Sequence, residues 1–236
     1  VYGFQIDLNT SFTGEDSLDV SIDAGNAAST SPLAEFDLNG PATTSASTSA
    51  DDILTVDGVS YTFPLGDKAT VIVGDNTDGS ALFNIACVYG GPSNTLDDCG
   101  TVKAGITGGG VALGASYDIG AGFTTAVGFQ FVETGIATEG NADSYAFNLA
   151  YTADNYGLSY TYAALETSGT RGLAHTDSYN AFNGYYTLDN GLSISAGYEV
   201  GALQNATSDE ADETESYFVG LDTEVGPGTF GVAYGT

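Results

Sequence analysis

Residues 111–131 read VALGASYDIGAGFTTAVGFQF, and this stretch decides the fold class. Mostly apolar residues stand at every second position in two runs, 111–119 and 123–131, and the residues between them are small or polar. A period of two predicts β-strands with one apolar and one polar face. Glycines at 120 and 122 permit a tight reversal, so the stretch predicts an antiparallel hairpin.

The same alternation recurs along most of the chain. Its other apolar positions are Tyr2, Phe4, Ile6, Leu8 and Phe12; Leu18, Val20, Ile22 and Ala24; Ala34, Phe36 and Leu38; Val59, Tyr61, Phe63 and Leu65; Ala69, Val71 and Val73; Tyr145, Phe147, Leu149 and Tyr151; Leu158, Tyr160 and Tyr162; Phe182, Tyr186 and Leu188; Leu192, Ile194, Ala196, Tyr198 and Val200; Tyr217, Val219, Leu221 and Val225; and Phe230, Val232 and Tyr234. The pattern predicts about 12–13 strands, each near the length that a tilted strand needs to cross a bilayer.

Short and long connections alternate between these strands. The tight turns are Gly66-Asp67, 120–122, Asp154-Asn155 and 189–191, and the longer polar stretches are 41–52, 133–143, 166–177 and 204–215. Turns on one side and loops on the other are typical of outer-membrane barrels. We therefore predict an all-β fold, a transmembrane antiparallel up-and-down β-barrel.

Charge excludes several classes of function. The chain has 31 Asp and Glu residues against 3 Lys and Arg, for a net charge of -28. Such a chain has no cationic surface for nucleic acid or for anionic lipid headgroups. Self-repulsion is tolerated where carboxylates lie in solvated loops or line a water-filled passage; an acidic surface suited to a saline habitat is the alternative interpretation. No run of about 18 apolar residues predicts a transmembrane helix.

Cys87 and Cys99 lie in the longest stretch without alternation, residues 76–100. With no histidine nearby, they make a poor zinc site, and a disulfide that closes a short loop in an oxidising compartment is the better interpretation. Loops of this length inside a fold are usually functional or disordered, and the cysteine pair favours an ordered one.

Catalytic motifs are missing from the sequence. The single histidine, His175, stands in a polar stretch with no Gly-x-Ser-x-Gly element near it. Gly108-Gly109-Gly110 is followed by no Lys-Ser/Thr pair, so it predicts a strand bend and not a phosphate loop. We predict that the chain is not an enzyme; a barrel hydrolase would have to use His175.

Polar residues opposite the apolar face are predicted to line the lumen if the apolar face meets lipid. These candidates are Gln5, Asp7, Asn9, Asp19, Ser21, Asp23, Glu35, Asp37, Asn148, Thr161 and Glu199. Their acidity favours cations over anions. Lys68, Lys103 and Arg171 are candidate cations at a constriction, or else pair with neighbours on loops.

The acidic stretch near residue 210 is a candidate calcium site. Its carboxylates are Asp209, Glu210, Asp212, Glu213 and Glu215. Calcium favours carboxylate-rich loops, but the spacing is not that of an EF-hand, and a solvated acidic loop is the alternative. A rival prediction for the whole chain is therefore a secreted acidic β-sandwich, a surface or adhesin protein with calcium-binding loops.

Three short blocks carry a family resemblance: 8–14 (LNTSFTG), 24–26 (AGN) and 61–66 (YTFPLG). In residue identity, order and spacing they resemble the barrel of cyanobacterial outer-membrane porins related to the carbohydrate-selective OprB type. The resemblance implies a homotrimer of 16-stranded barrels in the outer-membrane bilayer that passes small hydrophilic solutes and inorganic ions. Family members carry an N-terminal S-layer homology domain. We expect residues 1–236 to be an incomplete barrel domain without it, in a mature or trimmed chain.

Overall fold

The computed structural model describes residues 2–25, 54–90, 96–108, 110–136, 142–167, 175–204 and 212–236. Twelve strands are described: β1 (Gly3–Thr10), β2 (Ser17–Gly25), β3 (Thr55–Leu65), β4 (Ala69–Asp75), β5 (Val111–Gly120), β6 (Phe123–Phe131), β7 (Ser144–Thr152), β8 (Tyr156–Thr167), β9 (His175–Thr187), β10 (Ser193–Ala202), β11 (Glu213–Val225) and β12 (Gly228–Gly235). One short 3-10 turn, η2 (Glu133–Gly135), follows β6.

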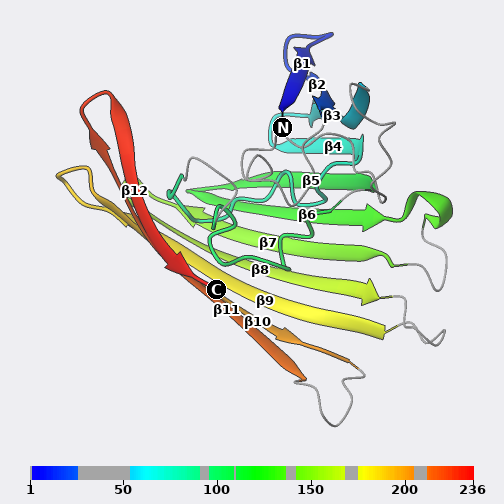
Figure 1. Ribbon diagram of the computed structural model, residues 1–236. Coiled ribbons are helices and arrows are strands. Elements are labelled where there is room, and N and C mark those ends of the chain that lie inside the picture. The colour runs from blue at the N-terminus through cyan, green and yellow to red at the C-terminus, as the bar shows by residue number, and fades with distance from the viewer. Residues whose placement is uncertain are drawn as a thin grey trace.

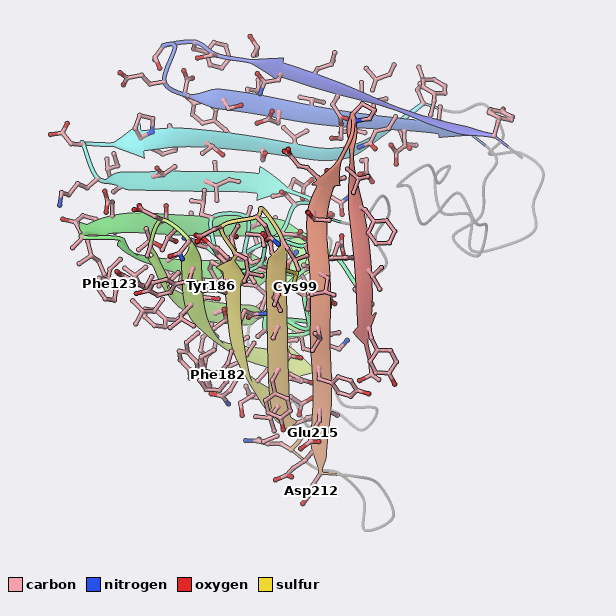
Figure 2. The ribbon with its side chains drawn as sticks, turned by 90° about the vertical axis from the view of Figure 1, so that its left-hand side faces the viewer. Cys99, Phe123, Phe182, Tyr186, Asp212 and Glu215 are labelled. Carbon is pink, nitrogen blue, oxygen red and sulfur yellow. A yellow bond between two sulfur atoms is a disulfide. The ribbon has the colours of Figure 1, made fainter. Side chains whose placement is uncertain are left out.

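All twelve strands belong to one sheet in which each strand pairs with its neighbour in sequence. Figure 1 shows them side by side in chain order, and Figure 2 shows the sheet bent around its inner side. Every pairing is antiparallel, so the predicted up-and-down all-β fold is confirmed. A two-sheet sandwich, the rival prediction, is wrong for the described residues because they form a single sheet. No pairing among these residues joins β1 to β12.

The alternation of short and long connections is also present. Odd-numbered strands lead into even-numbered ones through short turns, such as 66–68 and 121–122, and even-numbered strands lead into odd-numbered ones through longer segments. Strands β8 and β9 extend further than predicted: Glu166 pairs with Thr176 and Leu165 with Asp177. The sequence interpretation ended these strands at their polar residues, but backbone pairing in a ladder does not require apolar side chains.

Some predictions fall outside the described residues. These are the strand at 34–38, the loop at 41–52, and the side chains of Glu35, Asp37, Arg171, Asp209 and Glu210. Within the ranges that the structure covers, no helix is long and apolar enough to cross a membrane.

The two faces of the sheet differ in polarity, and their arrangement is the reverse of that in a soluble protein. One face carries the large apolar side chains, and many are exposed: Leu158 is 58% exposed and Val232 is 52% exposed. The other face carries small and polar residues, among which Thr161 and Ala181 are fully buried. We call these the outer and inner faces. Large apolar residues are normally found inside soluble proteins, so this sheet is apolar outside and polar inside.

Residues 76–110 connect β4 to β5, and we call them the inner segment. Their described part adds no strand to the sheet. It lies on the inner face, over the middle strands, as both figures show. What covers the buried polar residues of the inner face is therefore this segment and not a second sheet.

Candidate pore-lining surface and inner segment

Side chains from the inner face hold the backbone of the inner segment. The contacts run from β6 to β11: Gln130 Nε2 donates to Thr77 O (3.1 Å), Asn84 N to Asn148 Oδ1 (3.0 Å), Ala86 N to Ser159 Oγ (2.9 Å), Val88 N to Ser195 Oγ (3.1 Å), Asn183 Nδ2 to Cys99 O (2.8 Å), Ser216 Oγ to Gly100 O (3.1 Å), and Lys103 N and Ala104 N to the Glu199 carboxylate (3.0 and 2.7 Å). Backbone groups outside regular structure need such partners when they are buried. The described parts of the inner segment are thus fixed at several points between Thr77 and Ala104.

The predicted disulfide is confirmed: Cys87 and Cys99 are joined, with their Cα atoms 6.4 Å apart. Figure 2 places Cys99 behind β10, on the inner side. Next to it, Gly100 N donates to the Asp98 carboxylate at 2.9 Å, which closes a tight turn. The covalent link and the turn together hold Cys99 and Gly100 close to Cys87.

Two glycines let the inner segment touch the sheet. A Cβ atom at Gly128 of β6 would collide with the carbonyl oxygen of Gly79, and one at Gly197 of β10 with that of Cys99. Any side chain at these positions would push the segment away. Glycine inside a strand often marks such a close approach of another backbone.

A small apolar cluster anchors the end of the inner segment. Ala104 and Ile106 are buried against Ala146, Ala163 and Ala181 of the inner face. Alanine side chains at these positions are small enough for the inner segment to pack directly against the strands. The sheet itself has no large apolar interior, so this cluster is the main apolar core among the described residues.

The predicted pore-lining residues that the structure describes fall into two groups, both on the inner face. In β1 and β2, Asp7 and Asn9 are exposed, and the other four are half-buried. They bond to one another: Ser21 Oγ donates to Asp7 Oδ1 at 2.7 Å, and Asn9 Nδ2 donates to Asp19. In the register of the hairpin, Gln5, Asp7 and Asn9 lie opposite Asp23, Ser21 and Asp19. These carboxylates form an open, acidic stretch of wall.

Asn148, Thr161 and Glu199 form the second group. They are 1%, 0% and 4% exposed because the inner segment covers them. Asn148 also donates to Thr161 Oγ1 at 2.9 Å. They help to hold the inner segment, so the residues of that segment, and not these three, are exposed on the inner side. Sequence reasoning missed this role because alternation shows which face a side chain is on but not what covers that face.

The candidate cations lie in different places. Lys68 lies in the β3–β4 turn, with its Nζ 6.0 Å from the centre of the Tyr117 ring. Lys103 is exposed on the inner segment. It is also the one Lys or Arg in residues 76–110 of the sequence, against three acids, Asp78, Asp97 and Asp98. Lys103 is therefore the candidate that the structure places on the inner side.

The other predicted sites are only partly described. Asp212 precedes β11, Glu213 begins it, and Glu215 accepts a hydrogen bond from Tyr198 Oη at 2.9 Å. Figure 2 shows Asp212 and Glu215 at the end of this strand. Within the described ranges, no three His, Cys, Asp or Glu residues are arranged to hold a metal ion. His175 begins β9, with its Nε2 3.9 Å from Asp177, and not in a loop as predicted.

One antiparallel up-and-down sheet, apolar outside and polar inside, with a long segment folded against its inner face, is the fold of outer-membrane porins. Several solved structures resemble the chain, among them a porin and an outer-membrane channel. The anion-selective porin from Comamonas acidovorans aligns with 95% of this chain and 74% of its own, at 12% identity and a TM-score of 0.50. The outer-membrane channel DcaP of Acinetobacter baumannii aligns over 99% and 77%, at 9% identity and a TM-score of 0.51.

Sequence comparisons give no narrower assignment. No family model matches the chain, and no curated protein matches it in sequence. At identities this low, the two structures establish the fold alone. The resemblance to the cyanobacterial branch, related to the OprB type, stays a prediction.

Proposed function

We propose that this chain forms the wall of an outer-membrane porin for the passive diffusion of small hydrophilic solutes and inorganic ions. The observation that carries the proposal is the reversal of the two faces. Exposed apolar side chains such as Leu158 and Val232 are costly in water but favourable in a bilayer. A closed or completed β-sheet is also one of the two structures that satisfy all backbone groups in lipid.

The inner segment is the proposed constriction of the channel. It narrows the space inside the sheet, and its anchors from β6 to β11 keep it from collapsing into the passage or leaving it. A fixed obstruction with exposed polar side chains sets which solutes pass by size and charge. This gives the long stretch without alternation a function that a surface loop would not have.

We further propose that cations are preferred. The exposed Asp7 and the half-buried Asp19 stand on the wall formed by β1 and β2. The exposed Asp97 and Asp98 stand on the inner segment, whose sequence has one basic residue, Lys103. Carboxylates along a passage raise the local concentration of cations and lower that of anions. The similar Comamonas acidovorans protein is described as anion-selective, so a shared fold leaves selectivity to individual side chains.

The family resemblance supports two finer proposals. We propose a homotrimer, and membership of the cyanobacterial branch related to the carbohydrate-selective OprB type, on the three sequence blocks given above. Calcium binding by Asp212, Glu213 and the acidic residues before them stays a proposal that chelation would test. We propose a channel and not an enzyme, since the fold is shared with channel proteins.

The experiment combines detergent dependence with conductance. The purified chain should stay monodisperse only in detergent or lipid, show β-rich circular dichroism, and produce stepwise currents in planar bilayers. In a KCl gradient, the reversal potential should take the sign of a potassium-preferring pore. A monodisperse particle without detergent, or bilayers that stay silent with correctly folded protein, would exclude the proposal.

A further inference from the structure

Glu199 is the one charged side chain among the anchors of the inner segment. It lies on the inner face of β10 and is 4% exposed. Its two oxygens accept from Lys103 N at 3.0 Å each, and Oε2 also accepts from Ala104 N at 2.7 Å. The other anchors are amides and hydroxyls. Each makes one hydrogen bond to the segment, except Asn183, which makes two. Glu199 thus binds two consecutive backbone amides at one point.

A buried carboxylate is unfavourable unless it is well bonded. Removing it from water is costly, and charged hydrogen bonds and a nearby cation offset this cost. The two amides supply the bonds, and both Lys103 and Asp98 lie within electrostatic range of the carboxylate. The carboxyl group therefore ties this turn of the inner segment to β10 through both of its oxygens, at the residue that carries the only positive charge in the sequence of the segment.

The neighbouring residues explain what Glu199 positions. Ala104 and Ile106 are buried in the apolar cluster, while the Lys103 side chain is exposed. Ile106 N donates to Lys103 O at 3.1 Å, which makes a tight turn at this point. Glu199 holds the amide of Lys103 and the turn holds its carbonyl, so the backbone of Lys103 is fixed on both sides while its side chain stays exposed.

We propose that Glu199 is a positioning residue of the pore, and that Lys103, which it holds at the inner surface, is a specificity-determining residue. This rests on the proposed porin function. Lys103 opposes Asp97 and Asp98 on the same segment and so limits the preference for cations. Glu199 fixes the backbone from which the Lys103 side chain extends, so the ammonium group samples only the positions within reach of that point.

The test compares three variants in planar bilayers under a KCl gradient. Lys103→Gln should raise the potassium-to-chloride permeability ratio. Glu199→Gln, which keeps size but leaves the two amides with a weaker acceptor, should increase open-channel noise and reduce the effect of Lys103→Gln to less than half of its value alone. Glu215→Gln is the matched control, because it removes the same charge from an exposed residue that bonds Tyr198 and not the inner segment.

Additive effects of Lys103→Gln and Glu199→Gln, or equal effects of Glu199→Gln and Glu215→Gln, would overturn the proposal. Amide hydrogen exchange provides a second readout that needs no current. In Glu199→Gln, exchange at Lys103 and Ala104 should speed up by about tenfold or more, the factor expected for loss of a charged hydrogen bond. Unchanged exchange would refute the positioning role even if the pore conducts. Faster exchange in a protein without conductance would refute the porin function alone.

Discussion

The hairpin β1–β2 and the strands β7–β10 carry the same pattern of polar residues on the inner face, but only the second group is covered. Asp7 and Asn9 are exposed and bond mainly to side chains of their own hairpin. Asn148 and Thr161 are buried and help to hold the inner segment. An alternating polar residue in such a sheet can therefore either line the passage or hold the inner segment. Which of the two it does depends on whether a segment distant in sequence covers it.

Loss of the disulfide should give the largest effect and should be confined to the covered region. Replacing both Cys87 and Cys99 with serine releases a constraint across 12 residues of separation. We expect a loss of about 2–4 kcal/mol in the stability of the folded inner segment, as for other short disulfide loops. Hydrogen exchange should speed up at Asn84, Ala86 and Val88, with no change in β1–β2. Equal acceleration in both regions would mean that the disulfide stabilises the whole sheet.

Gly197→Val should displace the inner segment by a different route. Its side chain would collide with the Cys99 carbonyl, and overpacking of this kind typically costs about 1–3 kcal/mol. We expect a lower urea midpoint for the folded chain and an altered single-channel conductance. Gly228→Val, at a position with nothing within contact distance, is the control. If the two variants have the same conductance, the close approach at Gly197 does not shape the passage.

Asn183→Ala and Asn9→Ala compare the two regions with one chemistry. Asn183 is buried, donates to Cys99 O and accepts from Thr101 Oγ1 at 2.9 Å, so its loss leaves buried groups unpaired at a cost of about 1–3 kcal/mol. Asn9 is exposed, and water can replace its bonds. Unfolding in urea, with the chain in detergent micelles, should therefore separate the variants. Equal destabilisation would contradict the distinction between covered and open inner faces.

Asp16 provides the smallest effect, at the turn between β1 and β2. Side-chain hydrogen bonds from Thr13, Ser11 and Tyr61 hold the pKa of this carboxyl well below its ordinary value. The bonds favour the ionised form, so they stabilise the turn fully above the ordinary pKa of about 3.9 and lose that contribution as the pH falls further.

Hydrogen exchange at Phe12 and Thr13, whose amides donate to Asp16, should therefore accelerate below about pH 4 relative to the intrinsic rate. Asp16→Asn should show fast exchange at these amides already at neutral pH, with β7–β10 unchanged. If the exchange rates of these amides, relative to their intrinsic rates, are the same in the wild-type chain and in Asp16→Asn, both at neutral pH and at low pH, this account is contradicted.

The strands, turns and disulfide could be predicted from the sequence because each has a local signal. The alternation from Val111 to Phe131 predicted both strands, and the glycines between the two runs predicted their turn. The course of the inner segment could not be predicted, since its bonds join residues far apart: Asn84 to Asn148 and Gly100 to Ser216. Alternation tells which face a side chain is on but not what covers it. Glycines within strands, such as Gly197, were the available signal of close approach.

The central claim is that the outer face contacts lipid and the open inner face contacts water. Adjacent residues of β1 test it, because Leu8 points to the outer face and Asp7 to the inner face. Spin labels would be placed at each position in turn, with the chain in lipid vesicles, and relaxation by oxygen compared with relaxation by a water-soluble nickel complex. The account predicts that oxygen dominates at residue 8 and the nickel complex at residue 7. Strong relaxation by the nickel complex at both positions would contradict it.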